Sequence, residues 1–107
     1  MIVRCAYFEG TVDEKDREKF KQTIVDLVVP TMEKFPGVRD VRVLWSREIE
    51  EGAPEYFMVL QHFYDSLEAL HSALESDVRT EVWERLNQIM PLFDGRVVHI
   101  NYEVSGL

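Results

Sequence analysis

The segment from Tyr56 to Ser66, YFMVLQHFYDS, decides the fold. Most of it is the apolar run expected of a buried β-strand, and the Asp-Ser pair at its end is typical of the entry to a helix. Gln61 and His62 stand side by side near the end of this run. Because neighbouring residues of a strand point to opposite faces of a sheet, each face receives a polar group where an apolar surface is expected. What covers each face, and what the two polar groups do there, are the questions that this segment raises.

Three other segments have the pattern of β-strands. They are residues 2–8, which stop at Glu9-Gly10, residues 38–49, and residues 96–104. An acidic stretch at residues 48–54 contains Gly and Pro and is most simply the turn of a hairpin that leads into the Tyr56 strand.

Two helical regions separate these strands. The first begins with Asp13 as its expected N-cap and carries one apolar stripe, formed by Phe20, Ile24, Leu27, Val28 and Phe35. Pro30 lies late in that stripe, so we expect the helix to break or kink before it and to leave a last turn over 31–35. The second region begins with Ser66 as N-cap and is split in two, with a second stripe from Val78 to Ile89.

The order of elements is therefore β-α-β-β-α-β. This order is typical of the α+β ferredoxin-like fold, in which the helices pack on one face of a four-stranded antiparallel sheet. A chain of 107 residues has room for one core, so residues 1–107 are expected to form a single domain.

Composition limits the possible partners. The chain has 20 acidic and 12 basic residues and shows no basic stripe, which argues against a nucleic-acid partner. No segment approaches the length of a membrane span, and the first residues lack the apolar run of a signal peptide, so a cytoplasmic protein is expected. The single Cys5 is expected to be a small buried residue of the first strand. The three histidines lack the spacing of metal ligands, and we expect neither a metal nor a tightly held cofactor.

Both faces of the sheet are apolar. The strands do not alternate between apolar and polar residues, as those of a half-exposed sheet do. The helices can cover one face only, and the other is larger than the apolar patches that soluble monomers normally expose. A second copy of the chain is the simplest cover, so we expect a homodimer in which two sheets pack face to face.

These features resemble a known superfamily. The element order, the Phe35-Pro36-Gly37-Val38 entry to the second strand and the run from Phe63 to Leu70 are similar to the dimeric α+β barrel superfamily. Within it, Val29-Pro30 followed by Phe35-Pro36-Gly37 is most similar to the EthD-like group, named for ethyl tert-butyl ether degradation. Members of that group often carry a His shortly before the helix proline, whereas this chain has Leu27, Val28 and Val29 there.

The resemblance implies a dimeric barrel with a small-molecule pocket in each subunit, between the sheet and the helices. Relatives in the superfamily include cofactor-free monooxygenases, isomerases and haem-degrading enzymes. The haem-degrading relatives usually place an Asn on the first strand, and this chain has none there.

His62 is the main candidate for chemistry. Tyr64 directly precedes a helix entry and should face the helices, and strand parity takes His62, Leu60 and Met58 to the same side and Gln61 to the dimer face. A His titrates near neutral pH and suits acid–base catalysis. Tyr7 on the neighbouring strand is predicted to converge with it and to stabilise a developing oxyanion. The ligand-binding residues predicted around this pair are Tyr64, Leu60, Met58 and His71.

Other interpretations remain open at the level of sequence. His62 could be a core residue whose ring is satisfied by a carbonyl or a tyrosine hydroxyl. His99 belongs to a polar stretch of the last strand and is expected at a sheet edge or an interface. The function that fits best is a small cofactor-independent enzyme, monooxygenase-like or otherwise, acting on an apolar organic metabolite. A non-catalytic or stress-associated barrel that binds a hydrophobic ligand is the alternative, and an accessory protein that works through its dimer face is a third.

Overall fold

A computed structural model describes residues 1–106 of the chain; Leu107, the last residue of the predicted domain, lies outside the described residues. Four antiparallel strands form one sheet in the order β2-β3-β1-β4. The strands are β1 (Ile2–Val12), β2 (Asp40–Trp45), β3 (Tyr56–Tyr64) and β4 (Phe93–Glu103). This arrangement confirms the predicted ferredoxin-like α+β fold.

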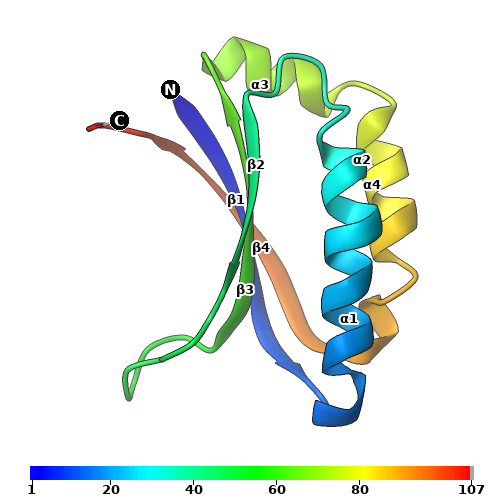
Figure 1. Ribbon diagram of the computed structural model, residues 1–107. Helices are drawn as coiled ribbons and strands as arrows, with labels where there is room; N and C mark the ends of the chain where they lie inside the picture. Colours follow the sequence, from blue (N-terminus) through cyan, green and yellow to red (C-terminus); the bar gives the residue numbers. More distant parts are fainter. Residues whose placement is uncertain (107) are drawn as a thin grey trace.

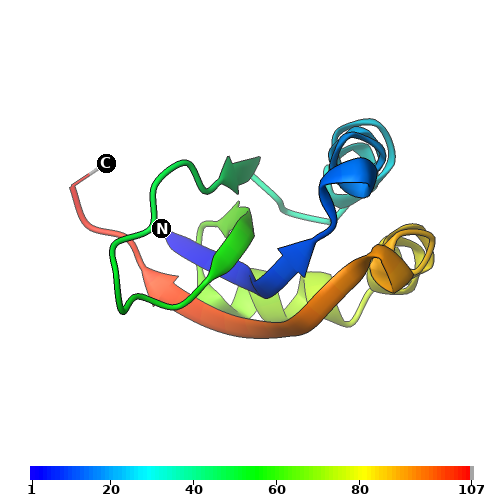
Figure 2. The same ribbon diagram turned by 90° about the horizontal axis from the view of Figure 1, so that it is seen from below.

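The helices lie on one side of the sheet, and the other side carries none (Figure 1). The first helical region contains η1 (Glu14–Asp16), α1 (Arg17–Thr23), η2 (Ile24–Val28) and α2 (Val29–Met32). The second contains α3 (Leu67–Leu74), α4 (Val78–Leu86) and η3 (Met90–Leu92). Figure 2 looks along α1 and α4, which lie beside each other against the sheet.

Of the two outcomes predicted at Pro30, a break or a kink of the first helix, the break does not occur. The turn before it, η2, widens to π-helical geometry, and the α-helix then resumes with Pro30 in the first turn of α2. A proline has no N–H and its ring crowds the carbonyl four residues earlier, so a wider turn lets the chain pass without a break. The hydroxyl of Thr31 donates to the Leu27 carbonyl oxygen at 2.7 Å and satisfies one acceptor in this region.

The first strand does not stop at Glu9-Gly10 either. It continues to Val12, because Gly10 lies directly opposite Gly95 and the pairing with β4 runs on to Phe93. Neither position has room for a Cβ, since each glycine lies against the backbone of the other strand. Two facing glycines therefore allow an approach of the backbones that larger residues would prevent.

A bulge near the start of β3 also changes the expected parity. The pairing register shifts between Phe8 and Glu9, so Tyr56 leaves the face that Met58 occupies. Phe57 instead packs into the core, with its ring 5.6 Å from that of Phe20 in an edge-on contact.

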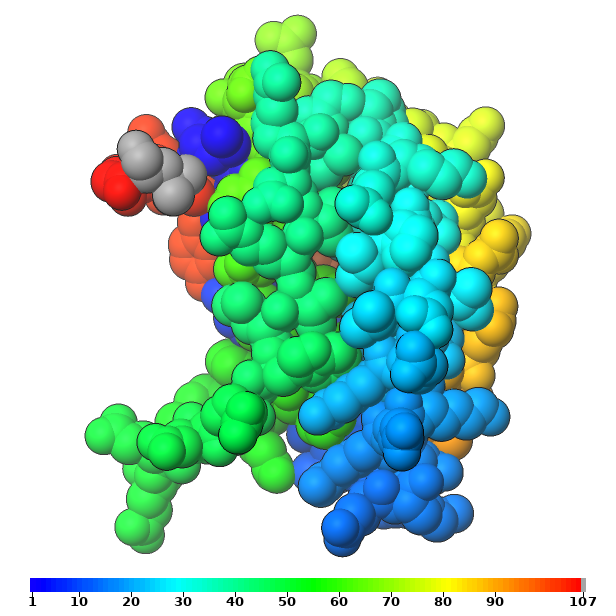
Figure 3. Space-filling view, in the orientation of Figure 1, coloured from blue at the N-terminus to red at the C-terminus, as the bar shows by residue number. Residues whose placement is uncertain are grey.

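Of the two predicted N-cap residues, Ser66 caps its helix and Asp13 does not. The N-cap at Ser66 is confirmed, because its hydroxyl oxygen accepts from the Ala69 N–H at 3.1 Å. Asp13 precedes a 3-10 turn and makes no side-chain capping bond. The second strand is shorter than predicted and ends at Trp45, and the remaining residues up to 55 form the long hairpin loop that protrudes from the molecule in Figure 3.

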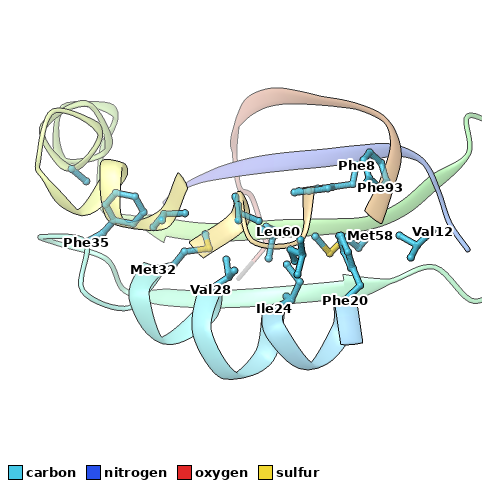
Figure 4. Packing of buried hydrophobic residues seen from close by; sticks show 14 of the residues in the cluster. Phe8, Val12, Phe20, Ile24, Val28, Met32, Phe35, Met58, Leu60 and Phe93 are labelled. Atoms are coloured by element: carbon cyan, nitrogen blue, oxygen red, sulfur yellow. The ribbon is translucent and has the colours of Figure 1, made fainter. Parts of the chain in front are cut away.

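The core lies between the helices and the sheet. One face of the first helical region sends Phe20, Ile24, Val28 and Met32 toward the sheet, and Met58 and Leu60 of β3 meet them there (Figure 4). All six are at most 4% exposed, so most of the predicted apolar stripe is the buried face of the helix. Leu27 was wrongly assigned to that stripe, since it is 40% exposed. Within residues 1–106, no helix has both the length and the apolar character needed to cross a bilayer.

The helix-free face carries a second apolar cluster. Val3 and Cys5 of β1 and Phe63 of β3 are buried there, with Tyr7 and Val59 packed against them. Gln61 lies on this face too and donates from Nε2 to the Cys5 sulfur at 3.5 Å. The predicted orientation of Gln61 and the predicted burial of Cys5 are confirmed. The outer strands extend this surface with side chains that are exposed in the single chain: Leu44 at 47%, Ile100 at 45% and Tyr102 at 40%.

Candidate functional site

A cavity of about 50 Å³ lies between the sheet and the helices. Most of its wall is apolar, with the side chains of Ala6 and Leu60 on the sheet and of Trp83 and Leu86 on α4. The remaining wall is polar and consists of two histidines and two arginines, His62, His99, Arg4 and Arg79. A mostly apolar wall with a few convergent polar groups is the usual lining of a small-molecule site, and a cavity of this volume, well below the roughly 300–1,000 Å³ of typical ligand pockets, suits only a very small ligand.

His62 is held in this wall by contacts on several sides. It is 6% exposed and stands directly across the sheet from Arg4, which places both side chains on the helix-covered face. The ring of Phe35 stacks on the imidazole, with centroids 5.1 Å apart and planes 17° from parallel. The ring is therefore fixed in orientation by packing before any ligand arrives.

One nitrogen of His62 is tied to a buried tyrosine. Nδ1 lies 2.7 Å from the hydroxyl of Tyr64, which is fully buried. Within residues 1–106 this hydroxyl has no other side-chain partner, so its proton has Nδ1 as its acceptor. The imidazole proton is then on Nε2, an assignment that follows from the hydrogen bond.

The other nitrogen reaches the cavity. Nε2 makes no hydrogen bond within residues 1–106, and no fully buried side-chain nitrogen or oxygen of these residues lacks a partner. Nε2 is therefore accessible, and the cavity is the space that the His62 ring lines. The neutral ring offers an N–H donor to whatever occupies that space.

The electrostatics keep His62 neutral. Burial, followed by the positive charge of Arg4 and the neighbouring His99, lowers the pKa of His62 to about 4. Burial also raises the pKa of the Tyr64 hydroxyl well above its usual value, so Tyr64 keeps its proton. At neutral pH the pair thus acts as a hydrogen-bond donor, since the only lone pair of the ring is occupied by Tyr64.

Two guanidinium groups and a second imidazole complete the polar wall. Arg4 donates from Nη1 to the Asn101 side-chain oxygen at 3.1 Å, and its pKa is lowered by burial and then by the charge of Arg79. His99 lies opposite Ala6 on the edge strand β4, as predicted, and its pKa is lowered by partial burial and by the two arginines. His99 is exposed to solvent, which screens these charges.

Tyr7 does not join this site, so its predicted convergence with His62 is wrong. Tyr7 pairs with Val59 across the sheet and points to the helix-free face. Its hydroxyl lies 2.6 Å from that of Tyr102, and its ring lies 4.9 Å from the ring of Tyr56. The reason is register: Arg4, not Tyr7, shares the parity of His62.

The other predicted ligand-binding residues occupy different places. Leu60 lines the cavity. Tyr64 contacts His62 but does not line the cavity, and Met58 is fully buried in the core. His71 is exposed on α3 and is not part of the cavity wall.

Sequence reasoning missed the two arginines. Arg4 is the one charged residue in the otherwise apolar run from Ile2 to Phe8, and that signal was available. Arg79 stands beside Val78 in a helix of mixed polarity, where nothing in the sequence separates it from a solvated surface residue.

Solved structures of other proteins share this fold. No protein-family model matches the chain, and no curated protein does. Solved structures match over nearly all of it: an EthD family protein from Bacillus halodurans has 20% sequence identity and a TM-score of 0.71, with 98% of this chain and 100% of that chain covered. The chain shares the fold of an EthD family protein.

Two further solved structures have the same fold. A dimeric ferredoxin-like protein of unknown function from Thermobifida fusca has 14% identity and a TM-score of 0.65, over 96% of this chain and 90% of that chain. A protein described as an antibiotic biosynthesis monooxygenase has 8% identity and a TM-score of 0.63, over 99% of this chain and 100% of that chain. The predicted likeness to EthD-like dimeric barrels is thus confirmed in the fold.

Proposed function

We propose that the chain is a small enzyme that acts on a largely apolar organic metabolite in the cavity beside His62. The observation that carries the proposal is the pairing of His62 with Tyr64, which leaves one donor, Nε2–H, open to an otherwise mostly apolar space. A donor fixed in a dry wall stabilises negative charge on a substrate oxygen better than water does, because it needs no reorganisation.

The reaction class that suits this donor is one in which negative charge develops on a substrate oxygen, as at a polarised carbonyl group. A neutral imidazole can donate to that oxygen and return to its starting state without a change of protonation. This role differs from the general acid–base catalysis suggested by the sequence, since Nδ1 is engaged by Tyr64. The EthD family and monooxygenase descriptions of the structural neighbours are consistent with a small-molecule enzyme.

We also propose that the protein is a homodimer formed through the helix-free face. The cluster around Val3, Cys5 and Phe63 continues onto exposed Leu44 and Ile100, and a surface of this kind is expected to be covered. The structural neighbour from Thermobifida fusca is described as dimeric.

A pair of double variants tests the enzymatic site. The first, His62→Phe with Tyr64→Phe, removes both partners of the buried hydrogen bond while keeping the ring stacked on Phe35. Removing both partners together is close to neutral for stability, so we expect a change of at most about 1 kcal/mol in the free energy of unfolding. Binding of compounds from a defined pool of small carbonyl and phenolic metabolites is read by thermal melts, and their conversion by mass spectrometry.

The matched control is Tyr7→Phe with Tyr102→Phe, which removes the hydroxyl pair of the opposite face. We expect a stabilising shift and conversion in the wild type and in this control, and neither in the His62/Tyr64 variant. An unchanged shift in the His62/Tyr64 variant, together with a large loss of its stability, would mean that His62 is a core residue. Binding without conversion would favour the non-catalytic ligand-binding barrel.

A further inference from the structure

The two arginines of the cavity are not paired with acids. Six ion pairs form within residues 1–106, and they engage four other arginines, Arg39, Arg42, Arg85 and Arg96, together with two lysines. Arg4 bonds to a neutral amide oxygen, that of Asn101, and Arg79 makes no side-chain hydrogen bond among these residues. Both nevertheless line one small cavity.

The chain has 20 acidic residues and a formal net charge of −8. Arg17 and Arg47 form no ion pair among the described residues either, so the distinctive feature of Arg4 and Arg79 is that both line the same cavity. Two guanidinium groups that line one cavity beside two histidines, with no ion pair to an acid among residues 1–106, are unfavourable because like charges repel, and because Arg4, unlike the exposed Arg79, is partly removed from water. The lowered pKa of Arg4, caused by burial and then by Arg79, reflects that cost.

We propose that the cavity recognises its ligand through a carboxylate group, held between Arg4 and Arg79. The ligand is then a small organic acid, and the proposal rests on the proposed function because it names the substrate class of the same site. A carboxylate would offset both charges, and the planar fork of a guanidinium matches its two oxygens. The Nε2–H of His62 can donate to a third oxygen of the same molecule or to the carboxylate itself.

The rest of the wall selects an apolar body over inorganic anions. Ala6, Leu60 and Val97 offer no hydrogen bond, and Trp83 presents a large aromatic surface. A bound phosphate would bring its charged oxygens against these apolar side chains, which is unfavourable. A short aliphatic acid would instead place its alkyl group against them. We therefore expect affinity to rise from acetate to butyrate and to be low for inorganic phosphate.

The test is a titration of the protein with butyrate, with butyramide as the neutral probe of the same shape and inorganic phosphate as the second anion. Binding is followed through the ring resonances of His62 at constant ionic strength. We expect butyrate to perturb His62 and to raise its pKa, and butyramide to bind about tenfold more weakly or less. In Arg79→Gln, butyrate affinity should fall about tenfold or more, whereas Arg47→Gln, a charge removed from the hairpin loop, should leave it unchanged.

The outcomes separate this inference from the proposed function. If butyramide binds as tightly as butyrate, or Arg79→Gln has no effect, the carboxylate proposal is wrong although the cavity remains a ligand site. Phosphate binding at least as tight as that of butyrate would also overturn it. Arg79→Lys should restore part of the affinity, which a merely structural role would not predict. If neutral carbonyl compounds also fail to perturb His62, the proposed function is wrong as well.

Discussion

Ile100→Asp should convert the protein from a dimer to a monomer. Ile100 lies on the helix-free face of β4, opposite Cys5, and is 45% exposed in the single chain. A charge at this position costs little in a monomer, but in a face-to-face packing of two sheets it would be buried without a partner. We expect the dissociation constant of the dimer to rise about a hundredfold or more, with the fold of each chain retained. Light scattering at micromolar concentration measures the mass directly.

Leu67→Asp is the matched control for this change. Leu67 is 47% exposed, nearly the same fraction as Ile100, but it begins α3 and lies outside the helix-free face. An acid in the first turn of a helix is also electrostatically favourable. This variant should keep twice the chain mass. A wild type that runs as a monomer, or an Ile100→Asp variant that stays dimeric, would refute the proposed interface.

Gly95→Ala should be the most destabilising of the small substitutions. A Cβ at Gly95 would clash with the Glu9 carbonyl oxygen and would lie 2.8 Å from the Gly10 Cα, and neither backbone atom can move away without breaking the pairing of β1 and β4. That pairing carries Val12 and Phe93 into the core. We expect a loss of about 3 kcal/mol or more in the free energy of unfolding, measured by urea denaturation.

Gly52→Ala provides the comparison. Gly52 lies in the hairpin loop with φ of +89°, and a Cβ there meets nothing within 4 Å. An alanine there is disfavoured only by the left-handed backbone conformation, so we expect Gly52→Ala to lower the free energy of unfolding by about 1 kcal/mol. If Gly95→Ala and Gly52→Ala lowered the free energy of unfolding equally, the close approach of β1 and β4 would not contribute to stability as described.

Local signals in the sequence were sufficient for much of the fold. Ser66 caps a helix where predicted, because capping depends on a side chain and the turn that follows it. The outcome at Pro30 could not be read in the same way, since the π-helical turn that accommodates it is stabilised by packing of Ile24 and Val28 in the core. The continuation of β1 past Gly10 required its partner, Gly95, which lies far away in the sequence.

The candidate site was predictable only in part. Parity within one strand correctly placed His62 toward the helices and Gln61 away from them. The relation between two strands depends on register, and a shift of one residue exchanges the faces, so Tyr7 was assigned to the wrong side and Arg4 was overlooked. Arg79 reaches the cavity from α4, and such tertiary convergence leaves no local pattern in the sequence.

The chemistry of His62 is tested most directly by nuclear magnetic resonance of its ring nitrogens across a pH titration. We expect a neutral ring with its proton on Nε2 and with Nδ1 accepting from Tyr64, and we expect this ring to stay neutral as the pH falls until about 4. Addition of a ligand of the cavity should shift Nε2 more than Nδ1, because Nε2 faces the cavity. A ring that carries its proton on Nδ1, titrates near the ordinary histidine pKa of about 6.5, or does not respond to any ligand would show that His62 is not the donor proposed here.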